Sequence, residues 1–131
     1  MNWKLILQLS LFGLAMAIGT VFVIPSNIEP LCWLGVFLVC AYLIAVHAPS
    51  RYFVHGLFVG IANSVWVTSA HVLLVDRYLA NHPREADMMT SMPWNTHPRI
   101  LMAMMGPVVG VISGAVLGVL ALVAGKLTRR N

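Results

Sequence analysis

The residues best suited to metal chemistry gather in one polar segment, residues 76–98, between two long apolar stretches. Two histidines, His82 and His97, are each followed by Pro-Arg, and acidic residues and methionines lie around them. Imidazole and carboxylate groups are common ligands of divalent transition metals, and thioethers suit Cu(I). One interpretation of the segment is therefore a transition-metal site, with copper favoured by the methionines. Its candidate ligands are His71, His82, His97, Asp76, Glu85, Met89 and Met92.

A structural interpretation of the same residues competes with metal binding. Their spacing matches no compact motif such as HExxH or CxxC, so the ligands would meet only through the fold. A histidine before a proline is typical of extended backbone at a helix boundary, and methionines often serve as flexible apolar filler. Hydrolytic chemistry would need a nucleophile beside a base, and nothing fixes Thr90 or Ser91 near His82. The sequence therefore predicts no catalytic residue.

A second group of polar residues lies inside the third apolar stretch. Ser64, Thr68 and His71 follow Gly60 at helical spacing, so they share one face of a helix. Polar side chains are costly against lipid, so this face is expected to turn towards other helices. It can line the pathway of a small channel or carrier, or it can form hydrogen bonds with a neighbouring helix. The candidate residues of this intramembrane polar site are Asn63, Ser64, Trp66, Thr68 and His71.

Glycines recur every four residues in the last apolar stretch, at Gly106, Gly110, Gly114 and Gly118. This spacing places them in one stripe along a helix, where a second helix can approach closely. The partner can be the first stretch, which offers Gly13 with Ala17, or a second copy of the chain. The stripe thus predicts a non-catalytic protein that self-associates or serves as a small subunit of a membrane complex.

The composition identifies the environment in which all these residues must be positioned. Of the 131 residues, 60% are hydrophobic and 9% are charged, and the mean hydropathy is +0.86. A soluble domain carries about 25% charged residues, so the chain is predicted to be an integral membrane protein. Nucleic-acid binding, disorder and a disulfide scaffold all fit this composition poorly, and the lipid bilayer is the partner it implies.

Four apolar stretches are long enough to cross a hydrocarbon core about 30 Å thick as helices. They span residues 5–24, 31–48, 53–75 and 100–125, with prolines and turn-forming residues between them. Ala15-Met16-Ala17 in the first stretch resembles a signal-peptide cleavage site, but the apolar run continues to Ile24, which favours a retained anchor. We therefore expect an all-α chain forming a single domain, residues 1–131, a compact up-down bundle of four helices.

Charge orients these predicted helices in the membrane. One side carries only basic residues, and all the acidic residues fall on the other side. The basic side holds Lys4, Arg51, Lys126, Arg129 and Arg130, and the acidic side holds Glu29, Asp76, Glu85 and Asp87 together with Arg77, Arg84 and Arg99.

The positive-inside rule then places both termini in the cytoplasm and the 76–98 loop on the outer face of the cell (inner) membrane. Interfacial aromatic residues agree, with Trp3 and Tyr52 on the inner side and Trp33, Tyr78 and Trp94 on the outer side. No acidic residue falls within a predicted span, so the sequence offers no carboxylate for a proton relay inside the membrane.

Overall fold

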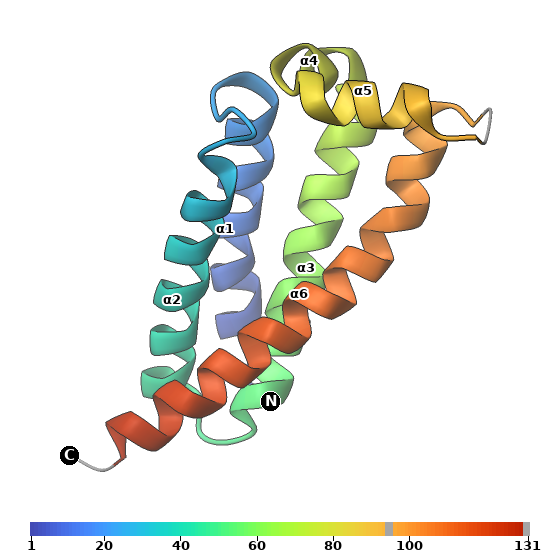
Figure 1. The fold of residues 1–131 in the computed structure, drawn as a ribbon. Coiled ribbons are helices and arrows are strands. Elements are labelled where there is room, and N and C mark those ends of the chain that lie inside the picture. Colours follow the sequence, from blue (N-terminus) through green and yellow to red (C-terminus); the bar gives the residue numbers. More distant parts are fainter. Residues whose placement is uncertain (94–95, 130–131) are drawn as a thin grey trace.

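The computed structural model describes residues 1–93 and 96–129, and in these residues it contains six helices and no strand (Figure 1). Four helices are long and apolar enough to cross a membrane. They are α1 (Trp3–Phe22), α2 (Glu29–His47), α3 (Tyr52–Leu73) and α6 (Pro98–Thr128). The prediction of an all-helical chain with four candidate spans is confirmed. Trp94 and Arg130, used above to orient the chain, lie outside the described residues.

The segment predicted as a long loop contains two short helices, α4 (Val75–Asn81) and α5 (Pro83–Ser91). Pro83 opens α5, since the first turn of a helix is where a missing N–H is tolerated. α2 begins at Glu29, two residues before the predicted span. Pro30 is compatible with this earlier start because it lies in the first turn of the helix. Both short helices lie across one end of the molecule, here called the capped end, while both chain termini lie at the opposite end (Figure 1).

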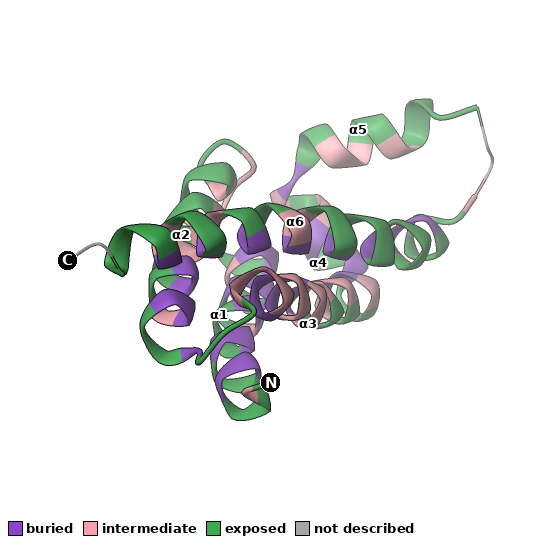
Figure 2. Ribbon diagram, turned by 90° about the horizontal axis from the view of Figure 1, so that it is seen from below, coloured by how far each residue is buried: buried purple, intermediate pink, exposed green. Residues whose placement is uncertain are grey.

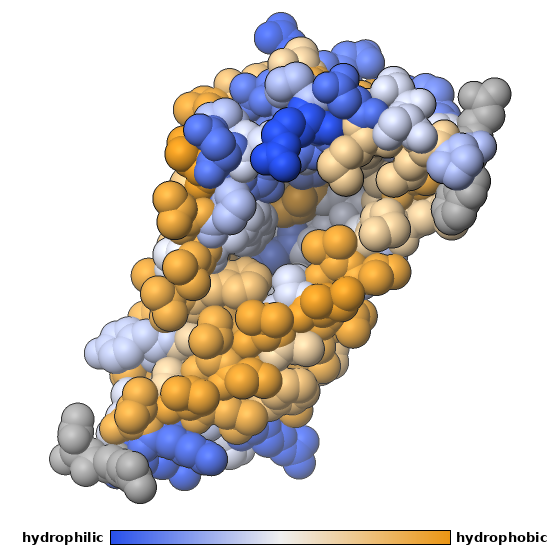
Figure 3. Space-filling view, in the orientation of Figure 1, coloured by the Kyte–Doolittle hydropathy of each residue, from blue (hydrophilic) through white to orange (hydrophobic). Residues whose placement is uncertain are grey.

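The faces of the long helices that turn away from their neighbours are apolar. In Figure 2 the buried residues lie where helices approach one another, and the outward faces are exposed. On α6 the exposed residues include Val108, Val111, Ile112, Val116 and Val119. Figure 3 shows the result as a hydrophobic band with hydrophilic residues at both ends. Such a surface suits lipid, and it supports membrane association.

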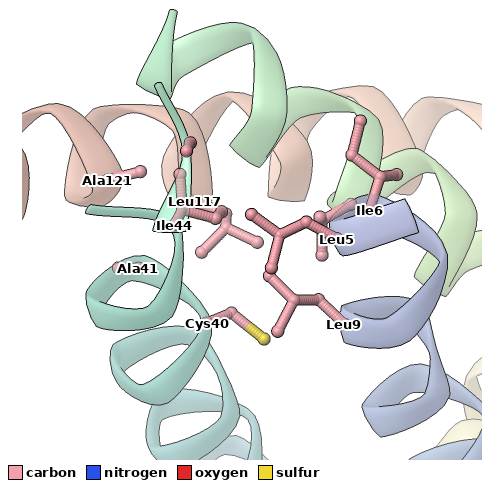
Figure 4. Packing of buried hydrophobic residues seen from close by; sticks show 10 residues of the cluster. Leu5, Ile6, Leu9, Cys40, Ala41, Ile44, Leu117 and Ala121 are labelled. Carbon is pink, nitrogen blue, oxygen red and sulfur yellow. The ribbon is translucent and has the colours of Figure 1, made fainter. Parts of the chain in front are cut away.

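The main hydrophobic core joins α1, α2 and α6, together with Val59 of α3, near the end that carries the termini (Figure 4). Its buried side chains include Leu5 and Leu9 from α1, Ile44 from α2 and Leu117 from α6. A smaller cluster around Val21, Val75, Tyr78 and Met102 lies towards the capped end. Packing between α2 and α6 is thus strongest far from the cap.

The glycine stripe of α6 faces α3 of the same chain. A side chain on any of its four glycines would overlap atoms of α3. The first span, one of the partners expected from the sequence, does not occupy the stripe; α3 does, because it carries its own small residues at the matching four-residue spacing. The contacts run in antiparallel order: Gly56 with Gly118, Gly60 with Gly114, Ser64 with Gly110, and Thr68 with Gly106.

The first helix uses its small residues against α3 as well. Gly13 packs directly on Asn63, and a Cβ atom at Gly13 would lie 2.7 Å from the Cα atom of Asn63. Ala17, four residues further on, is completely buried. The helix that Gly13 meets is therefore α3, and not α6 as the glycine stripe leads us to expect.

Candidate functional site

A cavity of about 590 Å³ lies between α2, α3 and α6 on the side of the capped end. The main core holds α2 and α6 together near the termini, and towards the cap the space between them is not filled. α3 forms one wall, and Met89 and Met92, at the end of α5, close the top. The hollow is visible from outside in Figure 3, between the apolar surfaces of α2 and α6.

The cavity wall is mainly apolar, with a few polar groups. Its volume and composition are those of small-molecule sites, which typically measure 300–1,000 Å³. The apolar residues are Trp33, Phe37, Val67, Met89, Met92, Leu101, Met102, Met105, Gly106 and Val109, and the polar ones are Glu29, Asn63, Ser64, Thr68, His71, Tyr78 and Ser113. In this lining, as far as the chain is described, Glu29 is the one carboxylate and there is no lysine or arginine.

Three aromatic rings stack at the capped end of the cavity. Tyr78 of α4 lies between His71 of α3 and His82, which follows α4. The ring centroids are 3.9 Å apart for His71 and Tyr78 and 4.2 Å for Tyr78 and His82. The stack forms because α4 starts directly after α3 and because residues 78 and 82 share one face of a helical turn.

His82 is completely buried and binds to two acceptors. Its Nδ1 lies 3.0 Å from the carbonyl oxygen of Tyr78, and its Nε2 lies 3.1 Å from Oε2 of Glu29. The other carboxylate oxygen of Glu29 accepts a hydrogen bond from the indole N–H of Trp33 at 3.3 Å. A carbonyl can only accept, so Nδ1 of His82 carries a proton. The contact between Nε2 and the carboxyl group then needs one more proton, which the Glu29–His82 pair shares.

His71 and Tyr78 each leave one hydrogen-bonding atom free at the cavity. The hydroxyl of Thr20 donates to the carbonyl of Ala17 at 3.2 Å, so Nε2 of His71 donates to Thr20 at 2.9 Å. Nδ1 of His71 and the hydroxyl of Tyr78 have no partner within residues 1–93 and 96–129, and neither atom is fully buried. The cavity therefore presents an acceptor at His71 and a hydroxyl at Tyr78.

The Tyr78 hydroxyl is held in its neutral form. Burial raises the pKa of Tyr78 far above its usual range, and the nearby carboxylates of Glu29 and Glu85 raise the pKa further. Both effects disfavour the phenolate, since it is a charged group with negative neighbours. Tyr78 is therefore a hydrogen-bond donor at physiological pH.

Asn63 lies in the part of the wall farther from the capped end, eight residues before His71. This separation corresponds to about 12 Å along a helix. Asn63 is 3% exposed, and neither Nδ2 nor Oδ1 has a hydrogen-bond partner among the described residues. An unpaired buried amide costs free energy, so this side chain is an unusual feature of a packed helix interface.

The other residues of the predicted intramembrane polar site divide between packing and the cavity. Ser64 and Thr68 contact the glycines of α6 and also line the cavity. Trp66 turns to α1, where its indole N–H donates to Ser10 Oγ at 3.3 Å. Among the described residues, Asn63, Thr68 and His71 are thus the members of the set that keep a polar side-chain atom without a hydrogen-bond partner.

The predicted metal ligands are dispersed. His82 pairs with Glu29, whereas Glu85 accepts a hydrogen bond from Ser26 Oγ at 2.7 Å. His97 lies at the start of α6, where its Nδ1 accepts a hydrogen bond from the backbone N–H of Arg99 at 3.2 Å. Asp76 is exposed at the start of α4.

The two candidate methionine ligands, Met89 and Met92, line the cavity. In the part of the chain that is described, no three His, Cys, Asp or Glu side chains are grouped to hold a metal ion.

Tyr78 and Glu29 are site residues that the sequence alone does not predict. The sequence indicates Tyr78 only as an aromatic residue of the outer interface, and it places Glu29 on the acidic side of the membrane, outside the predicted second span. The sequence does contain a signal, because an acidic residue directly before Pro30 fits the first turn of a helix. Its contact with His82, 53 positions away, has no local signature.

Comparison with known proteins gives no relative: no family model matches the chain, and neither a curated protein nor a solved structure is significantly similar to it.

Proposed function

We propose that residues 1–131 form a single membrane domain whose four long helices cross the cell (inner) membrane as an up-down bundle. Lys4, Arg51 and Lys126 lie towards one end of the helices, while Glu29 and Glu85 lie at the capped end. The positive-inside rule favours cytoplasmic termini and places α4 and α5 on the outer face. In this orientation the cavity lies in the outer half of the membrane.

We propose further that the protein binds an amphipathic small molecule taken from the outer leaflet. The observation that carries this proposal is the cavity, with apolar walls along α2, α3 and α6 and with the polar side chains of His71 and Tyr78 at its capped end. An alkyl chain would lie against Val67, Met105 and Val109. Its polar head would then meet Nδ1 of His71 and the hydroxyl of Tyr78.

The proposed binding site uses polar atoms of the cavity wall that, among the described residues, form no hydrogen bond between helices. Self-association through the glycine stripe, the first expectation from the sequence, would require surfaces other than Gly106, Gly110 and Gly114, since α3 covers them. Metal handling would have to begin from His71, whose Nδ1 has no partner within the described ranges. A channel or carrier that follows Ser64, Thr68 and His71 would use the same cavity.

The proposal is tested with radiolabelled 1-decanol and protein in nanodiscs of zwitterionic lipid, with the signal of empty nanodiscs subtracted. Val67→Phe places a large side chain in the cavity, whereas Val65→Phe places it on the lipid-facing side of the same helix, where Val65 is 57% exposed. We expect saturable binding of one decanol per chain, weakened about tenfold or more by Val67→Phe and unchanged by Val65→Phe.

A second matched pair of variants keeps the proposal testable if Val67→Phe does not fold. Met105 lines the cavity and is 54% exposed, and its neighbour Met104 is exposed but does not line it. Met105→Trp is expected to weaken decanol binding, and Met104→Trp is expected to leave it unchanged. Equal binding by all four variants, each with a wild-type circular dichroism spectrum, would overturn the proposed function.

A further inference from the structure

We propose that the ligand of this cavity is an amphipathic cation, and that its binding displaces the one proton shared by Glu29 and His82. This inference rests on the proposed function, because it specifies the charge of the molecule that the cavity binds. It adds an exchange reaction, in which one monovalent cation enters the site and one proton leaves to water.

The charges and rings of the wall favour a cation. Glu29 is the one carboxylate in the described lining, and this lining contains no lysine or arginine that would repel a positive head group. Trp33 and Phe37 lie edge to face one turn apart on α2, with ring centroids 6.0 Å apart. Tyr78 lines the same cavity. Aromatic faces attract ammonium groups, and the attraction is stronger where water is excluded.

The hydrogen bonds of His82 define the proton that the cation replaces. Nδ1 donates to the carbonyl of Tyr78, so the contact from Nε2 to Glu29 contains one further proton. With this proton the pair is neutral, either as imidazolium with carboxylate or as imidazole with carboxylic acid. Without it, two acceptor atoms face each other and the pair carries one negative charge.

Exchange keeps the net charge of the site constant. A cation that entered beside the protonated pair would leave one uncompensated positive charge in an apolar cavity, which is costly. A cation that entered as the proton left would be balanced by the charge of Glu29. By linkage, the cation and the proton weaken each other's binding by the same factor.

The other titratable groups that face the pair are His71 from α3, Tyr78 from α4 and Glu85 from α5. The cavity-lining residues of α6 are uncharged. Tyr78 stays neutral, and Glu85 is hydrogen-bonded to Ser26. Protonation of His71 at Nδ1 would also oppose a cation, so the experiment must separate His71 from the Glu29–His82 pair.

The test compares radiolabelled decyltrimethylammonium with 1-decanol, which has the same alkyl chain and no charge, in the nanodisc assay from about pH 5 to pH 8. We expect the affinity for the cation to rise with pH, with about tenfold per pH unit as the upper limit for a one-proton exchange, and the affinity for decanol to stay constant. This comparison uses the unmodified protein and needs no variant.

Three variants then assign the proton. Glu29→Gln is expected to weaken cation binding about tenfold or more and to abolish its pH dependence. His71→Gln is expected to retain the pH dependence. Asp87→Asn, which removes an exposed carboxylate of α5 outside the cavity, is expected to leave cation binding unchanged.

The outcomes separate this inference from the proposed function. If both probes bind with equal affinity at every pH, the cation exchange is wrong while ligand binding stands. If the pH dependence disappears in His71→Gln and persists in Glu29→Gln, the exchanged proton belongs to His71 and the inference is overturned. If neither probe binds, the proposed function falls, and this inference falls with it.

Discussion

Gly60 of α3 and Gly114 of α6 approach so closely that a Cβ atom on Gly60 would overlap the backbone of Gly114. The overlap involves backbone atoms, which cannot move aside as the end of a flexible side chain can. The two helices therefore depend on glycine at this crossing, and the same contact fixes where Ser64 and Thr68 lie relative to the cavity.

Gly60→Ala and Gly114→Ala are each expected to destabilise the folded chain by about 1–3 kcal/mol, the usual cost of overpacking an interface. Gly35 of α2 provides the matched control, since a Cβ atom there would meet nothing within 4 Å. Thermal unfolding in detergent, followed by circular dichroism, measures the difference. Equal unfolding temperatures for Gly35→Ala and Gly60→Ala would contradict the packing of α3 on α6.

Asn81 joins α4 to the end of α1, where its Nδ2 donates to the carbonyl oxygens of Thr20 and Ile24, both at 3.1 Å. Asn81→Ala is expected to cost about 1–3 kcal/mol, because the two carbonyls lose their donor. Asn81→Asp should cost more, since a carboxylate would face two acceptors. The unfolding temperature should therefore fall in the order Asn, Ala, Asp, with Ser91→Ala as an exposed control. An aspartate variant as stable as the native chain would refute these hydrogen bonds.

Ionisation of Tyr78 is expected to make the folded protein less stable at alkaline pH. Burial and then Glu29 and Glu85 raise its pKa in the folded state, whereas a tyrosine in an unfolded chain ionises near pH 10. Above about pH 10 the unfolded chain releases a proton that the folded chain keeps, so this contribution to stability is present below pH 10 and is lost as pH rises.

Unfolding temperatures measured from about pH 8 to pH 11 check this dependence. Tyr78→Phe is expected to make the alkaline loss of stability shallower, because phenylalanine cannot ionise. Tyr42→Phe removes an exposed tyrosine and is expected to leave the loss as steep as in the native chain. Identical profiles for Tyr78→Phe and Tyr42→Phe would contradict the raised pKa of Tyr78 in the folded chain.

The proposed orientation is checked by cysteine labelling in intact cells. Cys32 and Cys40 are the two native cysteines and are first replaced by alanine. In this background Asp87→Cys, in α5, is expected to react with a membrane-impermeant maleimide applied outside. Ser50→Cys, in the turn before α3, should react only after the membrane is permeabilised. The reverse pattern would place the capped end in the cytoplasm.

The sequence alone predicted the four long helices, because a helix in lipid must satisfy its own backbone hydrogen bonds and so needs a continuous apolar stretch of sufficient length. The hydrogen bonds within a helix and the apolar stretch that it needs are both properties of a continuous segment of the chain. Pro30 and Pro83 add a second local signal, since they mark the first turns of α2 and α5. The two short helices were predicted as a loop because their polar sequence lacks the long apolar pattern of a span.

Only the tertiary structure decided which helices meet. A glycine stripe is compatible with any face of small residues, and the sequence predicts that Gly60, Ser64 and Thr68 share a polar face without indicating that this face packs on α6. Glu29 and His82 are 53 positions apart, and they meet because α4 places His82 beside the start of α2. The cavity likewise exists because α2 and α6 pack tightly near the termini and leave space near the cap, a property of their relative placement that neither helix carries in its own sequence.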